Sequence, residues 1–179
     1  FFIQESDTDV DADPLTSEGL FVFNTANTIT PSNGDLVRVA GNVSEFFGRT
    51  QLSPAQDLII CGTGSVSTTT LSLPFTSVEQ PEALEGMLVS NADSLTVSDN
   101  YNLAKFGEVT LSSSRLFVPT NIHLPGSAEA VALANENSLN RITLDDGVNG
   151  SYPEQITFPT GGLSADNSLR IGDLVTELT

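Results

Sequence analysis

A motif that occurs twice limits the folds open to this chain. Residues 34–41 read GDLVRVAG and residues 172–179 read GDLVTELT, about 138 residues apart. A short apolar strand candidate precedes each copy at nearly the same distance, FFIQESD at 1–7 and RITLDDG at 141–147. Internal similarity of this kind indicates repeated structural units. The sequence therefore predicts two related β modules.

Alternation of apolar and polar residues makes β-strands the main expected element. A hairpin is expected between the first four residues and GLFVF at 19–23, across a long acidic loop. Residues 35–46 then alternate valines with polar side chains, as half-buried strands do. Gly41 lies within that run and predicts a bulge or a sharp bend.

Few helices are expected. Residues 127–138 form the clearest candidate, with Ser127 as N-cap and Glu129 in the first turn. YNLAKFGE at 101–108 is predicted to form a single helical turn. The stretch 119–126 is bounded by prolines and is expected to be a loop.

These elements together predict a mainly β fold made of two OB-like β-barrel modules, with one short helix in the second. Small barrels close by bending long strands, often at a glycine. The expected boundaries are 1–66 for the first module, 67–83 for a polar connector and 84–179 for the second module. The first module has no strand before Phe1 and the second has none after Thr179, so the fold is expected to be incomplete at both ends.

The charge of the chain is strongly negative and argues against a basic binding groove. Asp and Glu number 23 against 6 Lys and Arg, which gives a formal net charge of −17. Binding to nucleic-acid phosphates normally depends on Lys and Arg. We therefore expect contact with nucleic acid to be weak, salt-sensitive or bridged by cations. No run approaches the roughly 18–20 apolar residues that cross a bilayer, so no membrane span is expected.

The loop DTDVDADPLTSE at 7–18 has the acidic spacing of a calcium loop. Its carboxylates belong to Asp7, Asp9, Asp11, Asp13 and Glu18. In calcium loops, alternate carboxylates turn inward onto one hard cation. Ala12 stands where such a loop has glycine, and the flanking segments are expected to be strands. The pattern predicts a Ca²⁺ site of strand–loop–strand type, and the alternative is a solvated acidic hairpin tip.

Aromatic side chains near cations are the candidate nucleic-acid contacts. Two groups combine rings with a cation: Phe46 and Phe47 beside Arg49, and Tyr101 with Lys105 and Phe106. Single-stranded nucleic acid binds OB barrels by stacking its bases on such rings. The alternative is that these phenylalanines belong to the core, as most phenylalanines at strand spacing do.

No catalytic constellation stands out. His123 and Cys61 are the only residues of their types. The sequence contains no nucleophile elbow, phosphate-binding loop or dinucleotide-binding glycine pattern. Val37 and Val175 stand where the Gly-Asp-x-Asn signature of metal-dependent phosphodiesterases requires asparagine. Asp145-Asp146-Gly147 is interpreted as a tight turn. The segment is therefore expected to be non-catalytic.

Six strings of the chain are similar to segments of one known protein family. FFIQESDTDVDADPLTSEGLFVF and GDLVRVAGNVSEFFGRTQL resemble the OB-fold module of ExeM-type secreted bacterial nucleases. LEGMLV, LTVSDNYNLAKFGEVTLS, RLFVPTN and NRITLDDG resemble the segment that follows it. Members of that family often read D-x-D-G-D in the acidic loop, where this chain has Val10 and Ala12.

The resemblance implies a secreted or surface-attached parent that degrades extracellular DNA or RNA with a divalent metal. It also implies a catalytic partner, the endonuclease/exonuclease/phosphatase domain of the same parent chain, whose signatures these residues lack. The first expected function is a module that binds or positions single-stranded DNA or RNA. The second is structural, because unpaired β edges recruit strands from neighbouring copies and can assemble head to tail into oligomers or filaments.

Overall fold

The computed structural model describes residues 1–11, 13–24, 29–148, 150–176 and 178. The fold is mainly β, with 30% strand and 15% helix, which confirms the expected class. The chain divides into two compact units, which consist of Phe1–Thr70 with Val78–Ser90 and of Leu71–Ser77 with Asn91–Leu178. Residues of the expected connector 67–83 are thus shared between the units. All sheets among the described residues are open, and none closes into a barrel.

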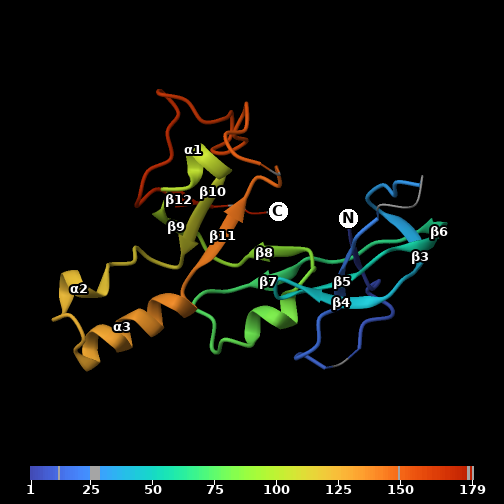
Figure 1. The fold of residues 1–179 in the computed structure, drawn as a ribbon, viewed down its shortest axis with the longest axis horizontal. Coiled ribbons are helices and arrows are strands. Elements are labelled where there is room, and N and C mark those ends of the chain that lie inside the picture. The colour runs from blue at the N-terminus through green and yellow to red at the C-terminus, as the bar shows by residue number, and fades with distance from the viewer. Residues whose placement is uncertain (12, 25–28, 149, 177, 179) are drawn as a thin grey trace. The chain divides into compact units, whose positions relative to one another are not determined.

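The first unit contains a four-stranded mixed sheet (Figure 1). Its strands, in spatial order, are β1 (Phe2–Gln4), β2 (Gly19–Val22), β5 (Arg49–Leu52) and β4 (Val43–Phe46). β1 and β2 are antiparallel, which confirms the expected hairpin, and so are β4 and β5. The central pair, β2 and β5, is parallel.

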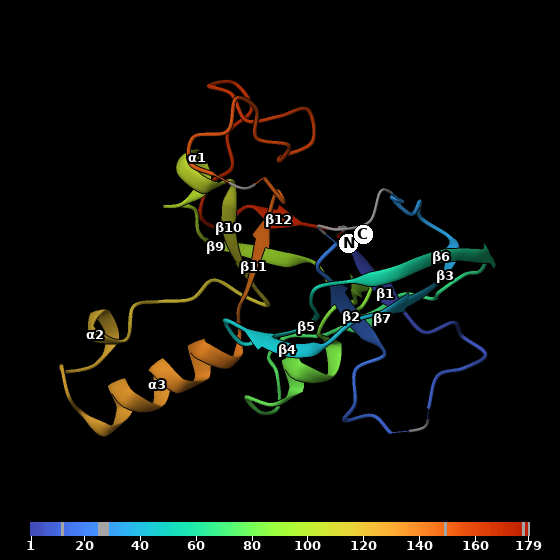
Figure 2. The same ribbon diagram turned by 45° about the vertical axis from the view of Figure 1, so that its right-hand side comes forward.

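A bend at Gly41 divides the long alternating run into two strands. β3 (Asp35–Ala40) pairs with β6 (Gln56–Thr63) in an antiparallel ribbon (Figure 2), whereas β4 joins the mixed sheet. A Cβ atom on Gly41 would lie 2.7 Å from Cγ of Leu52 and 2.8 Å from the carbonyl oxygen of Pro54. The close approach of Leu52 requires glycine here, and the predicted bend is confirmed.

The core of the first unit lies against one face of the mixed sheet. Val22 and Ala55 are fully buried, and Leu52 is nearly so. Ile3 and Leu20 pack against them. All the strand residues of this core point to the same side, because residues paired in register share a face.

The second unit is built on an antiparallel sheet. Its strands, in spatial order, are β11 (Ile142–Asp145), β10 (Glu108–Ser112), β9 (Leu95–Asp99) and β12 (Leu174–Val175). Leu95, Val97, Val109 and Leu111 form its buried core. Two further short strands, β7 (Thr69–Leu71) and β8 (Val89–Asn91), pair with each other.

Four short helical segments complete the described structure. They are η1 (Gln80–Leu84), α1 (Leu103–Phe106), α2 (Pro119–Ile122) and α3 (Ala128–Leu139). The helix predicted at 127–138 is confirmed as α3, and the Oγ atom of Ser127 accepts from the backbone N–H of Ala130 at 3.2 Å. The predicted turn at 101–108 contains α1. The loop expected at 119–126 instead begins with α2, which starts at Pro119.

The repeated motif forms the same local turn in both copies. The carboxylate of Asp35 accepts from the backbone N–H of Ser32 at 2.8 Å, and that of Asp173 accepts from the backbone N–H of Arg170 at 2.7 Å. Gly34 has a φ of 87° and the glycine of the second copy a φ of 97°, a conformation that favours glycine.

The strands that follow the two turns find different partners. β3 pairs with β6, which follows it in the chain, whereas β12 pairs with β9, which precedes it by about 75 residues. The repeat is therefore a repeated turn and strand, and the pairing around it differs between the units.

Candidate nucleic-acid interface

The mixed sheet of the first unit carries aromatic side chains on the face opposite its core. Phe2 pairs with Phe21, and Phe46 pairs with Arg49. Phe21 pairs with Gln51, two residues beyond Arg49 on β5. Since residues in register share a face and alternate residues along a strand do too, all five lie on one side. We call Phe2, Phe21, Phe46, Arg49 and Gln51, with Phe47 at the hairpin tip, the aromatic sheet face.

Arg49 stacks on the aromatic residues at the centre of this face. Its guanidinium carbon lies 4.0 Å from the ring centroid of Phe21. The ring of Phe2 lies 5.0 Å from that of Phe21, at an interplanar angle of 59°. A planar guanidinium on an aromatic face is a favourable cation–π arrangement. Its Nε atom is enclosed and has no hydrogen-bond partner among the described residues.

The β4–β5 hairpin extends the face with two more rings. Phe46 and Phe47 meet edge to face, with centroids 4.7 Å apart and an interplanar angle of 87°. Phe47 and Gly48 both have positive φ values, 53° and 78°, as tight hairpin turns require. Phe47 is 97% exposed, and Phe46 and Phe2 are 52% and 57% exposed. These three rings are therefore open to solvent and available for stacking.

The segment Glu85–Leu88 is bound to the sheet at the end that holds Gly19 and Thr50, next to Arg49 and the β4–β5 hairpin. The Glu85 carboxylate accepts from the backbone N–H of Thr50 at 2.9 Å, and its carbonyl accepts from Oγ of Ser17 at 2.5 Å. The backbone N–H of Leu88 donates to Oε1 of Gln4 at 2.8 Å. We call this segment the strap. It covers the part of the aromatic sheet face around Gly19, whereas Phe2, Phe46 and Phe47 stay exposed.

The strap is held against the sheet by a contact between two glycines. A Cβ atom built on Gly19 would lie 2.3 Å from the carbonyl carbon of Gly86 and 2.6 Å from the carbonyl oxygen of Glu85. No side chain fits there without moving the strap. Gly19 is in register with Gln4 and lies two residues before Phe21 on β2, so it faces the same side of the sheet as Phe21. The contact with the strap therefore lies on the aromatic side of the sheet.

The second predicted ring-and-cation group lies on the second unit. Tyr101 precedes α1 and is 90% exposed, while Lys105 and Phe106 belong to that helix. The ammonium of Lys105 lies 4.6 Å from the ring centroid of Phe106. The sequence did not single out Tyr152, which is 71% exposed and whose backbone N–H donates to the carbonyl of Lys105 at 2.6 Å. We call these four residues the tyrosine surface.

The acidic loop does not gather its carboxylates around one point. Asp7 accepts two hydrogen bonds from Ser67, at 2.8 and 2.9 Å, and Asp9 accepts one from Ser6 at 2.7 Å. Asp11 accepts from the backbone N–H of Asp13 at 2.7 Å. Among the described residues, which exclude Ala12 of this loop, no three His, Cys, Asp or Glu side chains form a metal-binding group. Calcium binding at these residues stays a prediction.

Glu18 nevertheless experiences the charge of the loop. Partial desolvation raises the pKa of its carboxyl, and the neighbouring carboxylate of Asp11 raises it further. Both effects disfavour the charged form. Within the predicted calcium loop, Asp11 and Glu18 are therefore close enough to interact.

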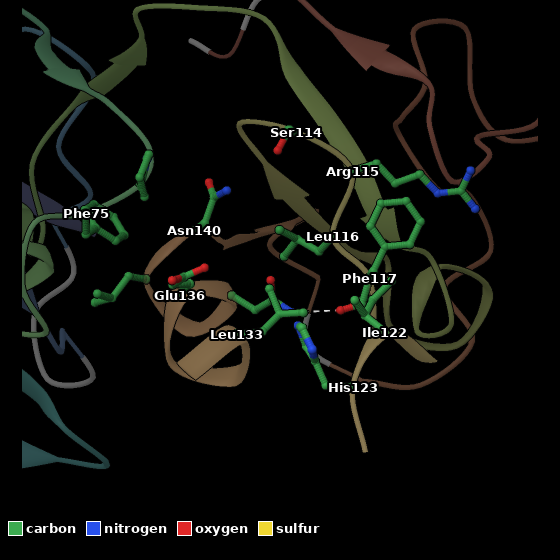
Figure 3. Close-up of a pocket in the computed structure, with 13 residues that line it drawn as sticks. Phe75, Ser114, Arg115, Leu116, Phe117, Ile122, His123, Leu133, Glu136 and Asn140 are labelled. Carbon is green, nitrogen blue, oxygen red and sulfur yellow. Dashed lines mark hydrogen bonds between the residues drawn. The ribbon is translucent and has the colours of Figure 1, made fainter. Parts of the chain in front are cut away.

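A large open cavity occurs in the second unit (Figure 3). Its volume is about 640 Å³, and its walls come from Phe75, the segment 114–117, the end of α2 and one side of α3. Leu116 and Leu133 make the lining largely apolar, whereas the guanidinium carbon of Arg115 lies 5.6 Å from the ring centroid of Phe117 (Figure 3). His123 also lines the cavity, directly after α2. No sequence pattern predicted the cavity.

Comparison with known proteins returns no relative: no family model, no curated protein and no solved structure matches this chain. No helix among the described residues has the length and apolar character needed to cross a bilayer. The two aromatic surfaces are therefore the features of the molecule that indicate a function.

Proposed function

We propose that this chain is a non-catalytic module that binds single-stranded DNA or RNA on the aromatic sheet face. The observation that carries the proposal is the register of the mixed sheet. It places Phe2, Phe21, Phe46 and Arg49 on the face opposite the core. Folded domains normally bury such rings, and an exposed group of aromatic residues marks a binding surface.

Stacking is the interaction that this surface offers. A base that stacks on an aromatic side chain contributes roughly 1–3 kcal/mol, and the unpaired bases of a single strand are free to stack. Phe47 and Phe46 at the hairpin tip would each receive a base, and Arg49 on the ring of Phe21 would meet the backbone or a further base. Duplex bases are already stacked on each other, so single strands are the expected ligand.

The finer fold that we propose for the first unit is an OB-like barrel represented by four strands. An OB-fold is a five-stranded, partly open barrel whose second and third strands bind oligonucleotides. The mixed order β1-β2-β5-β4, the parallel central pair and the bend at Gly41 support this assignment. β1 and β2 would then be the strands that carry the binding surface. For the second unit, the shared turn-and-strand motif supports an OB-like arrangement more weakly.

The biological setting that we propose is a secreted or cell-surface nuclease whose catalytic domain acts on the strand that this module holds. The resemblance of the sequence strings to ExeM-type nucleases supports that setting. The net charge of −17 sets the expected affinity low. The logarithm of the binding constant falls linearly with the logarithm of the salt concentration, with a slope of about −0.7 for each phosphate that is neutralised on a single strand. Because Arg49 is the one arginine of this face, we expect the binding constant to depend only weakly on salt.

A direct test is fluorescence anisotropy with labelled single-stranded and duplex oligonucleotides at low salt. The first variant replaces both hairpin rings, F46A with F47A, and the matched control is Leu15→Ala. Leu15 is 81% exposed and lies on the acidic loop of the same unit. We expect single-strand affinity to fall about tenfold or more in the double variant, from the stacking energy of two bases. Equal affinities for wild type and double variant would refute the proposal.

The second candidate function is assembly through the open edge of β4. All four residues of β4 are exposed. Ser53 donates to the carbonyl of Asn42 at 2.7 Å, so Asn42 belongs to a hydrogen-bonded pair. Hydrogen-bonded and non-hydrogen-bonded pairs alternate along an antiparallel ladder. The backbone N–H and C=O groups of Val43 and Glu45 therefore point away from β5. Light scattering should then show that the apparent mass of the wild-type protein rises with concentration. The apparent mass of the Val43→Lys variant should be lower at the same concentration, because a lysine on an edge strand blocks strand addition. A wild-type protein that stays monomeric at high concentration would refute assembly.

A further inference from the structure

The outer face of the second sheet is made of hydrogen-bonding side chains. Glu108 is in register with Asp145, and Thr110 with both Thr143 and Asp99. The opposite face holds the buried core residues, including Val109 between Glu108 and Thr110. This outer face therefore offers carboxylates and hydroxyls.

Tyr101 borders a small hollow in this outer face. The hollow measures about 80 Å³, and Asp99, Asn102, Glu108 and Thr143 also line it. The Asp99 carboxylate accepts from the backbone N–H of Tyr101 at 2.8 Å. The Glu108 carboxylate accepts from Nδ2 of Asn102 at 2.9 Å. These two bonds fix the position of both carboxylates relative to Tyr101.

Each of these carboxylates keeps one oxygen available. Within the described residues, neither the second oxygen of Asp99 nor that of Glu108 accepts a hydrogen bond. An ionised carboxylate accepts hydrogen bonds and donates none. The hollow beside the Tyr101 ring is therefore a place for a ligand that presents N–H groups at its edge and a flat ring to the tyrosine.

The C-terminal part of α1 adds a cation and a contact with a second tyrosine. The backbone N–H of Tyr152 donates to the carbonyl of Lys105, which ties the loop around residue 152 to the helix. Tyr152 has a φ of 59°, a rare conformation for a bulky residue. Two exposed tyrosines and the ammonium of Lys105 thus lie in or next to the four-residue helix α1. Rings with a nearby cation are the elements that hold single strands.

We infer that the tyrosine surface is a second nucleobase site and that it selects bases with an exocyclic amino group, cytosine above thymine. This inference rests on the proposed binding of single-stranded nucleic acid. Cytosine presents its N4 amino group as a donor, and carboxylates of Asp and Glu are its usual acceptors. The base stacks on Tyr101, and Glu108 or Asp99 accepts from the amino group.

Thymine is disfavoured because of the atoms at the same edge. It presents the O4 carbonyl where cytosine presents the amino group, and a carbonyl oxygen facing a carboxylate brings two acceptors together. The carboxylates also repel phosphates, which leaves Lys105 as the backbone contact on this surface. Base identity rather than phosphate charge therefore determines binding here.

Tyrosine fluorescence reports this surface separately from the aromatic sheet face. The chain has two tyrosines and no tryptophan, and both tyrosines belong to the tyrosine surface. The experiment titrates the protein with octamers of deoxycytidine and of deoxythymidine at low salt. Quenching, corrected for absorbance, is followed beside the anisotropy of labelled octamers. We expect quenching by deoxycytidine at about fivefold or more lower concentration than by deoxythymidine, as one discriminating base contact gives.

Two variants separate the possible outcomes. Glu108→Gln keeps the size of the side chain and removes its charge, and it should abolish the preference for deoxycytidine in the quenching signal. F46A with F47A should keep that preference while lowering the anisotropy signal. Equal quenching by both octamers, or binding by anisotropy without quenching, would overturn this inference and leave the proposed function standing. If neither signal responds to any octamer, both the inference and the proposed function fail.

Discussion

Replacement of Gly19 by alanine tests how the strap is held on the sheet. The new Cβ would lie 2.3 Å from the carbonyl carbon of Gly86, and backbone atoms cannot rotate out of the way. The strap must therefore move. Three hydrogen bonds depend on its position, those that join Glu85 to Ser17 and to Thr50, and the one that joins Leu88 to Gln4.

The expected loss follows from these contacts. Each hydrogen bond contributes about 0.5–1.5 kcal/mol net, so partial loss of three gives about 2–3 kcal/mol, and overpacking alone costs about 1–3 kcal/mol. A glycine replaced by alanine at a compatible site gains about 0.4–1 kcal/mol. We therefore expect Gly19→Ala to lower the unfolding free energy of the first unit by about 2–5 kcal/mol.

Hydrogen exchange of the β2 and β5 amides, read by NMR, measures this loss locally. The matched control is Gly64→Ala in the same unit, since a Cβ atom there meets nothing within 4 Å and the backbone is not in the positive-φ region. The control should be unchanged or slightly more stable. If Gly19→Ala protects these amides as well as Gly64→Ala does, the close packing of Gly19 against Gly86 is wrong.

Three further predictions concern charges and caps. Ser127→Ala should destabilise the second unit by about 1 kcal/mol, through loss of the α3 N-cap. The pKa of Glu129 is lowered by hydrogen bonds to its own backbone N–H and to Ser127, so it should rise in this variant. In the wild type, the stabilisation that the charged Glu129 gives is present above the ordinary pKa of the carboxyl and is lost as pH falls through the lowered value. An NMR titration of the Glu129 carboxyl detects the change in pKa. Glu18→Gln should raise the melting temperature near pH 7, because the raised pKa of Glu18 indicates that the folded state disfavours its negative charge. The difference in melting temperature between the variant and the wild type should vanish well below pH 4.5, where Glu18 is protonated. Calcium should raise the melting temperature by screening Asp11 from Glu18, and identical calorimetric curves with calcium and with chelator would reject the calcium site.

Features set by a few neighbouring residues could be predicted from the sequence. The β1–β2 hairpin and the α3 helix follow from local periodicity and from the Ser127 cap. The bend at Gly41 follows from a glycine inside an alternating run. α2 was missed because four residues are too few to show a helical period, although Pro119 is a usual first helical residue.

Long-range pairing could not be predicted in the same way. The two copies of the GDLV motif form the same turn, but β3 and β12 pair with strands at very different sequence separations. Local sequence does not specify those partners. The closed barrels expected from the pattern depend on such pairings, and the described sheets are open.

The candidate interface was predicted in part. Phe46, Phe47 and Arg49 were recognised because a cation lies beside two rings in the sequence. Phe2 was not assigned to the interface, because Phe1, Phe2 and Ile3 are all apolar and their order does not reveal which face is buried. The register of β1 with β2 shows which face is buried, because Ile3 packs against the core and Phe2 lies on the opposite face.

The most direct test of the account is an NMR titration of the whole chain with a single-stranded octanucleotide at low salt. The account predicts that the largest amide shifts of the first unit map to β1, β2, β5 and the β4–β5 hairpin, with aromatic proton shifts from Phe46 and Phe47. Shifts confined to other segments of that unit, or none at millimolar oligonucleotide, would contradict it.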